Sequence, residues 1–293
     1  MSEYHISVLL QETIDGLKVE NGKKYIDATL GGGGHTREII NRGGIVLGID
    51  QDNDALDYVK KNFAEEIANS KLRIAKGNFS NIDSIAHEQG FENVQGILFD
   101  IGISSHHVDT HERGFSFLRN APLDMRMDQS AAVSAADLVN GLTRGELQEL
   151  FEKYAEETHA KKIAEVISRA REERRIETTG ELAAIVKRGY PPGFYKIHPA
   201  TKVFQALRIA VNDELNSIKD ALPKAFELLG AGGRIAVISF HSLEDRIVKQ
   251  TFVQLEAEGV GTILTAHPVQ PTEKEMEENR RSRSAKLRII EKL

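Results

Sequence analysis

The chain has 293 residues, which suits one large α/β domain that carries an insertion of about 100 residues. Its composition, 40% hydrophobic and 28% charged, is that of a globular protein and excludes disorder as the main state. The absence of cysteine excludes disulfides, thiolate zinc sites, iron–sulfur clusters and a thiol nucleophile.

No stretch approaches the roughly 18 apolar residues of a membrane helix, and the N-terminus does not resemble a signal peptide, so we expect a soluble cytoplasmic protein with no membrane partner. The net charge of −6 arises in residues 1–112, which hold 18 acidic against 10 basic side chains. Bulk charge therefore does not indicate nucleic-acid binding, which would have to depend on local patches.

The first hundred residues alternate between the periods of strands and helices. Strands are predicted at 24–30, 45–50, 71–75 and 97–100. Helices are predicted between them, at 36–42, 53–66 and 81–89. This alternation indicates βαβ units and a doubly wound, mostly parallel sheet.

The following segment has no convincing buried strand. Helices are predicted at 135–140, 144–154, 159–174 and 180–187. Thr143 with Glu146, and Thr178 with Glu181, have the spacing of capping boxes. We therefore predict that residues 113–197 form an all-helical domain, inserted into an α/β domain made of residues 1–112 and 198–293.

The α/β pattern then resumes. We predict one long amphipathic helix at 201–229, bent near Pro223. The remaining predicted elements are a strand at 234–240, a helix at 243–255 and strands at 262–266 and 285–291. Residues 273–283 are highly charged and are predicted to form a mobile loop.

Four consecutive glycines, Gly31–Gly34, stand between the first strand and the first helix of this pattern. Such a turn lets the backbone approach a ligand closely. The run lacks the G-x-G-x-x-G spacing of dinucleotide sites and the G-K-[ST] of phosphate-binding loops. An adenosine-type ligand without a diphosphate fits best, with Asp50 accepting hydrogen bonds from its ribose.

Three acidic side chains, Asp27, Asp50 and Asp100, lie toward the carboxyl ends of predicted parallel strands. Ligands of open α/β sheets bind at the carboxyl ends of the strands, so three acids beside a glycine run favour a site over simple turn residues. His106, His107 and His111 are also clustered, but they are more typical of a solvated loop, and no metal site is predicted.

Two later segments are basic. Residues 196–202 follow an aromatic-rich loop at 190–195, and a dense cluster runs from Arg280 to Arg288. Aromatic side chains interleaved with cations suit single-stranded nucleic acid. For the arginine cluster alone, a solvated charged face is an equally good interpretation.

The sequence closely resembles the family of bacterial SAM-dependent methyltransferases that make N4-methylcytidine in 16S ribosomal RNA. The matching segments are 5–10, 27–37, 48–50, 100–105, 113–117, 122–128, 198–201, 204–209, 239–249 and 283–288. The resemblance implies a class I methyltransferase fold with an inserted helical domain that recognises the substrate.

The resemblance also assigns the site. It implies S-adenosylmethionine (SAM) as cofactor, with contacts from Gly33, Gly34, His35, Asp50, Phe79, Asp100 and His107. The family usually has Gln where His107 stands. The implied partners are 16S rRNA and the small ribosomal subunit, with a homodimer left open.

The chemistry agrees with a reaction at an exocyclic amine. Methylation of cytosine C5 ordinarily requires a cysteine nucleophile, which this chain lacks. An amine needs orientation and an acceptor for its N–H. Asp100, our candidate catalytic residue, or a backbone carbonyl following it could serve as that acceptor. Phe115, Phe117 and Tyr195 are candidates for stacking on the base. A SAM-binding assembly factor without catalysis and a nicotinamide-dependent dehydrogenase are the alternatives.

Overall fold

The computed structural model describes residues 7–293, apart from the side chain of Ser105. The chain forms two compact units: one runs up to Ser104 and resumes at Leu215–Leu293, and the other is Ser105–Glu214. No helix in the described part of the chain has the length and apolar character needed to cross a bilayer.

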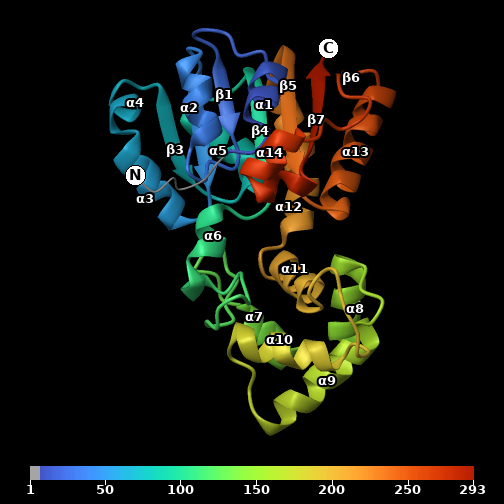
Figure 1. Cartoon of the computed structure of the whole chain (residues 1–293). Coiled ribbons are helices and arrows are strands. Elements are labelled where there is room, and N and C mark those ends of the chain that lie inside the picture. Colours follow the sequence, from blue (N-terminus) through green and yellow to red (C-terminus); the bar gives the residue numbers. More distant parts are fainter. Residues whose placement is uncertain (1–6) are drawn as a thin grey trace. The chain divides into compact units, whose positions relative to one another are not determined.

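The first unit is built on a seven-stranded sheet with helices on both sides (Figure 1). The strands are β1 (Lys24–Asp27), β2 (Ile45–Asp50), β3 (Leu72–Lys76), β4 (Val94–Asp100), β5 (Leu229–Ser239), β6 (Gly261–Ile263) and β7 (Lys286–Lys292). Their order is β3-β2-β1-β4-β5-β7-β6. The first five run parallel and β7 is antiparallel to both neighbours, which confirms the predicted doubly wound, mostly parallel sheet.

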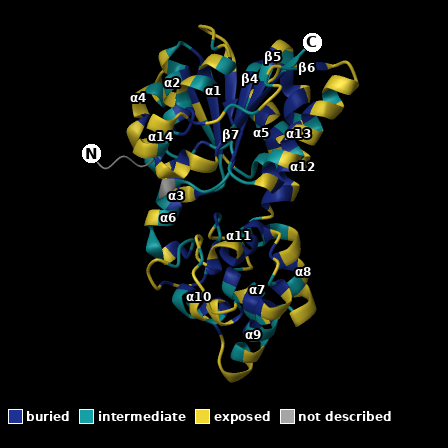
Figure 2. Ribbon diagram, turned by 45° about the vertical axis from the view of Figure 1, so that its right-hand side comes forward, coloured by how far each residue is buried: buried dark blue, intermediate teal, exposed yellow. Residues whose placement is uncertain are grey.

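The sheet is buried on both faces, as parallel sheets are (Figure 2). One face packs on α1 (Leu10–Gly16) and α2 (Gly34–Asn41) through alternate residues such as Tyr25, Val46 and Leu98. The helices of this unit are α1 (Leu10–Gly16), α2 (Gly34–Asn41), α3 (Asn53–Asn62), α4 (Ala64–Ala68), α5 (Ile82–Gln89), α12 (Glu214–Leu228), α13 (Ser242–Ala257) and α14 (Glu273–Glu278), with 3-10 turns η1 (Phe79–Asn81) and η3 (Arg280–Ser284).

The second unit is all-helical in its described residues. Its elements are α6 (Ser105–Asp109), η2 (His111–Arg113), α7 (Ala135–Gly141), α8 (Arg144–Ala155), α9 (Ala160–Glu173), α10 (Thr179–Arg188) and α11 (Ala200–Val211). Both predicted capping boxes are formed, Thr143 with Glu146 and Thr178 with Glu181. The unit is longer than 113–197, because α11 packs on α8 and α7 and shares their apolar core.

The single helix predicted at 201–229 is wrong. The chain breaks between α11 and α12, where Asp213 has a φ of +48°, and α12 continues through Pro223. Asn212 causes the break: its side-chain amide donates to Met125 O at 2.8 Å and its Oδ1 accepts from Met127 N at 2.8 Å. A side chain bound in this way competes with continuation of the helix.

The mobile loop predicted at 273–283 is also wrong, because this segment forms α14 and η3. Thr272 caps α14 by accepting from Glu275 N. The carboxylate of Glu275 accepts a hydrogen bond from Leu9 N at 2.8 Å, and Ser282 is fully buried. The segment is therefore ordered and anchored to the rest of the unit despite its high charge.

Candidate cofactor and catalytic site

The glycine run forms a tight turn that joins β1 to α2 and is tied to the end of β2. The amide of Gly31 donates to Asp50 Oδ2 at 2.8 Å, and the amide of Leu30 donates to Ile49 O at 3.0 Å. The other carboxylate oxygen of Asp50 accepts from Asp52 N at 2.9 Å. Asp50 thus holds the turn in place and stays partly exposed beside it.

Packing within the unit explains two of these glycines. Gly33, the N-cap of α2, has a φ of +75°, and a Cβ there would lie 2.7 Å from the ring of Phe63. A Cβ on Gly34 would collide with the hydroxyl of Ser7. The missing side chains let α2 approach its neighbours, so a cofactor contact is not their only reason to be glycine.

Asp27, at the end of β1, is an internal support of the site. It is 1% exposed and accepts hydrogen bonds from Thr36 Oγ1 at 2.7 Å and from Thr29 N at 3.2 Å. Burial raises its pKa to about 6, against the opposing effect of these hydrogen bonds. Asp27 therefore fixes the start of α2 to the strand edge.

Asp100, at the end of β4, is the most perturbed acid of the site. Its backbone amide donates to Thr29 Oγ1 at 2.6 Å, while its side-chain Oδ1 is buried with no hydrogen-bond partner among residues 7–293. Burial, and then the charges of Asp27 and Glu244, raise its pKa to about 8. The carboxyl therefore holds its proton at pH 7 in this state.

Two further predicted residues lie at the same edge. His35 is buried in α2, with Nε2 3.1 Å from Val8 O and Nδ1 3.8 Å from Asp100 Oδ2. Phe79 follows β3 in η1, and its ring meets Phe99 edge-on at 5.7 Å. The structure thus brings together six of the seven predicted cofactor residues, because all lie at or just beyond the carboxyl ends of β1 to β4.

His107 belongs to the helical unit. Its buried ring, in α6, lies 4.9 Å from Phe115. Phe115 and Phe117 are partly buried against the helical core. The predicted cofactor contact of His107 stays a prediction.

Sequence reasoning missed Glu244 as a charged neighbour of Asp100, the candidate catalytic residue. Glu244 is fully buried at the start of α13, where its Oε2 accepts from Phe240 N at 2.7 Å and from His241 N at 3.1 Å. This is a capping box with His241 in the place usually taken by Ser or Thr. Because a histidine occupies the cap position, the sequence does not show the usual capping-box pattern here. The only sequence signal for Glu244 is an acidic residue that closely follows a buried strand.

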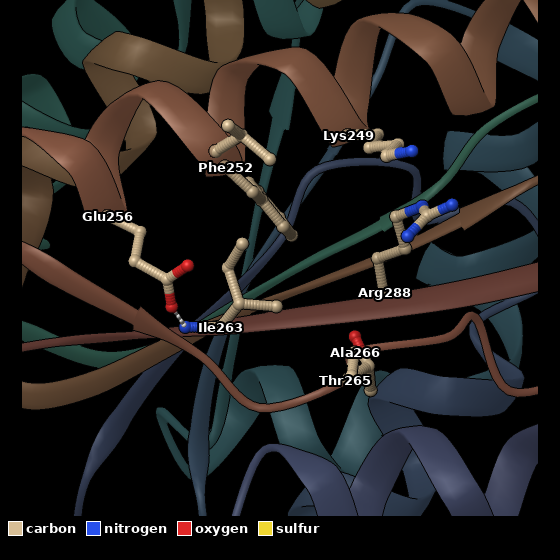
Figure 3. Close-up of a pocket in the computed structure, with 8 residues that line it drawn as sticks. Lys249, Phe252, Glu256, Ile263, Thr265, Ala266 and Arg288 are labelled. Carbon is tan, nitrogen blue, oxygen red and sulfur yellow. Dashed lines mark hydrogen bonds between the residues drawn. The ribbon is translucent and has the colours of Figure 1, made fainter.

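A separate pocket of about 270 Å³ lies beneath α13, between that helix and strands β6 and β7 (Figure 3). Its lining is Lys249, Phe252, Val253, Glu256, Ile263, Thr265, Ala266 and Arg288. None of the predicted site residues lines it. Glu256 closes one side by accepting a hydrogen bond from Ile263 N at 2.9 Å.

The basic cluster near the end of the sequence is partly internal. Arg288 donates to Asp245 Oδ1 at 2.6 Å, and Lys286 Nζ lies 3.2 Å from Asp245 Oδ2. Hydrogen bonds and charges from these two cations hold the pKa of Asp245 below its ordinary value, against its partial burial. These two cations therefore brace β7 against α13.

Known proteins match the whole chain. The ribosomal RNA small subunit methyltransferase H of Fusobacterium nucleatum subsp. nucleatum is 44% identical over 310 residues, which cover 100% of this chain and 98% of that protein. A solved rRNA methylase from Streptococcus thermophilus is 13% identical, covers 98% of each chain and has a TM-score of 0.48. The family model described as the MraW methylase family matches residues 2–293. The chain belongs to the MraW methylase family.

Proposed function

We propose that this protein transfers a methyl group from SAM to the exocyclic N4 amine of a cytidine in small-subunit (16S) ribosomal RNA, acting in the cytoplasm. Membership of a methylase family supports the reaction class, and the name of the 44% identical relative supports the RNA. The observation that carries the proposal is the carboxyl of Asp100 beside a glycine turn, whose Oδ1 is buried and has no hydrogen-bond partner among residues 7–293.

The strand edge fits SAM. A partly exposed carboxylate suited to ribose hydroxyls, Asp50, stands beside the turn, and the unpartnered Oδ1 of Asp100 offers a polar atom that a ligand would satisfy. When bound, SAM supplies an electrophilic methyl group on a positively charged sulfur. The residues of the first unit that would hold it are Gly33, Gly34, His35, Asp50, Phe79 and Asp100.

Asp100 has two chemical forms with different uses. The protonated carboxyl donates a hydrogen bond, whereas the ionised carboxylate accepts one from the N–H of an amine. Its raised pKa, about 8, keeps it protonated at pH 7 until a positive charge nearby favours the ionised form. Asp100 is therefore an acceptor whose activity depends on what occupies the site.

Methyl transfer from labelled SAM to small ribosomal subunits, taken from cells that lack this protein, tests the proposal. We expect new N4-methylcytidine by nucleoside mass spectrometry with the wild-type protein, and its loss with Asp100→Ala. Demonstrated SAM binding without any methylated nucleoside would favour the non-catalytic assembly factor. Binding of nicotinamide dinucleotide in place of SAM would favour the dehydrogenase.

A further inference from the structure

Phe194, in the helical unit, is the most exposed large apolar side chain among residues 7–293, at 95%. Leu118 at 84% and Ile197 at 65% are the next most exposed in this unit. Exposed apolar side chains gathered on one surface often mark an interaction site. The other aromatic residues proposed for stacking are occupied: Phe117 lies between His198 and Phe204, at 4.8 and 4.9 Å.

The loop that carries Phe194 is held in shape. The ring of Tyr195 packs edge-on against Tyr190 at 5.3 Å, and its hydroxyl donates to Pro191 O. The hydroxyl of Tyr190 in turn donates to the buried Glu157. Tyr195 therefore anchors the loop, and Phe194 is the ring left facing solvent.

The two sequence segments that carry these side chains contain basic residues but no acidic ones. From residue 182 to residue 212 the chain has five Lys or Arg and no Asp or Glu, and residues 113–123 have two Arg and no acid. The ring contact between Phe117 and His198 places the two segments side by side. Some of these cations form ion pairs within the unit. For example, Nε of Arg208 lies 2.9 Å from Oε1 of Glu214.

Four other cationic side chains of the same segments face solvent. Arg119, Lys187, Arg188 and Lys196 are exposed, and none of the four has an ion-pair partner among the described residues. A free aromatic ring among open cations suits unpaired nucleic acid, because bases stack on the ring while phosphates pair with the cations.

We propose that this surface, defined by Arg119, Lys187, Arg188, Phe194 and Lys196, binds a single-stranded segment of RNA with a base stacked on Phe194. The inference rests on the proposed function for the choice of RNA. It adds two points to that function: which part of the chain binds the RNA, and that the bound RNA is single-stranded.

The absence of tryptophan provides a direct test. Phe194→Trp places a single fluorescent reporter on the surface, and Val253→Trp places a matched reporter at an exposed apolar position on α13. The probe is a single-stranded oligoribonucleotide of about 12 nucleotides, titrated into the full chain. We expect the indole emission of the Phe194→Trp variant to be quenched as the probe saturates, while the emission of the Val253→Trp variant stays unchanged. A duplex of the same sequence should have no effect on either variant.

Affinity provides the second readout. Phe194→Leu, which keeps an apolar side chain but removes the ring, should raise the Kd for the oligoribonucleotide roughly tenfold. Lys196→Gln should lower the slope of log affinity against log salt by about 0.7. Affinity for SAM should stay unchanged in both variants.

Unquenched emission of the Phe194→Trp variant at saturation, or a wild-type Kd for Phe194→Leu, would overturn the proposal. It would equally be overturned if Phe194→Leu left RNA affinity intact but converted a dimer into a monomer in sedimentation, since the surface would then belong to a second copy. Neither readout uses methyl transfer. Failure of the proposed reaction is therefore distinguishable from failure of this surface.

Discussion

Nδ1 of His35 lies 3.8 Å from Oδ2 of Asp100, close enough for electrostatic interaction but too far for a hydrogen bond. The other ring nitrogen, Nε2, lies 3.1 Å from Val8 O, which suits an N–H at that position. Nδ1 is then the nitrogen that faces the acid. Within residues 7–293, Asp100 therefore lacks the close donor that usually keeps a carboxylate in such surroundings ionised.

The raised pKa of Asp100 should make its ionisation destabilising. Its folded-state pKa of about 8 exceeds the unfolded value, so the stability it contributes is full below about pH 4 and is lost as the pH rises to about 8. We expect Asp100→Asn to become more stable than the wild type by about 1–3 kcal/mol near pH 9, with little gain near pH 4. Urea unfolding without SAM measures this difference.

The control for this prediction is Asp57→Asn, which changes an exposed acid that pairs with Lys60 on α3. Its effect on the free energy of unfolding should be small. If Asp100→Asn changed the free energy of unfolding equally at both pH values, ionisation of Asp100 would not destabilise the folded state.

The same ionisation should make cofactor affinity depend on pH. An ionised Asp100 attracts the positive sulfur of SAM but gains nothing from the neutral sulfur of S-adenosylhomocysteine. We therefore expect SAM affinity to rise between about pH 6 and about pH 8, by up to about tenfold per pH unit, with a flatter curve for the product. Calorimetry with both ligands over this pH range measures the two affinities. Parallel plots of affinity against pH for SAM and S-adenosylhomocysteine would contradict the prediction.

Asp50 should contribute to cofactor binding in two ways. Its carboxylate orients the glycine turn through Gly31 N and offers acceptors for ribose hydroxyls. Asp50→Ala should weaken SAM binding about tenfold or more, measured by calorimetry. Asp54→Ala, at the first turn of α3, is the neighbouring control, and an unchanged SAM affinity for Asp50→Ala would remove the ribose assignment.

Gly33 should be needed for folding as well as for binding. Gly33→Ala forces a side chain onto a backbone at φ +75° and pushes its Cβ to 2.7 Å from the buried ring of Phe63. Gly22→Ala is a matched control, since Gly22 has a φ of +77° and open space around its Cβ position. We expect a loss of about 1 kcal/mol for Gly22→Ala and an extra loss of about 1–3 kcal/mol for Gly33→Ala, in thermal unfolding. Equal losses would show that Phe63 does not limit this position.

Local signals account for the parts of the fold that the sequence predicts well. The apolar runs that form β2 and β4, and the glycine turn between β1 and α2, are short-range patterns with a direct structural cause. Adjacent parallel strands then bring Asp27, Asp50 and Asp100 to one edge, as predicted. This part of the site follows from topology.

The errors have long-range causes. The chain breaks at Asn212 because of Met125 and Met127, which lie 87 and 85 residues away in sequence, and no local pattern reports them. The charged segment at 273–283 is ordered by contacts such as that of Glu275 with Leu9, 266 residues distant. The protonation of Asp100 likewise depends on burial and on Glu244, from another strand–helix junction.

Strand β7 is the last described strand in chain order, yet it lies between β5 and β6. During synthesis from the N-terminus, β5 therefore has an open edge and β6 has no neighbour until β7 emerges. An unpaired central edge is where chains associate wrongly. The timing of this one strand should set when the nascent protein stops needing protection by chaperones.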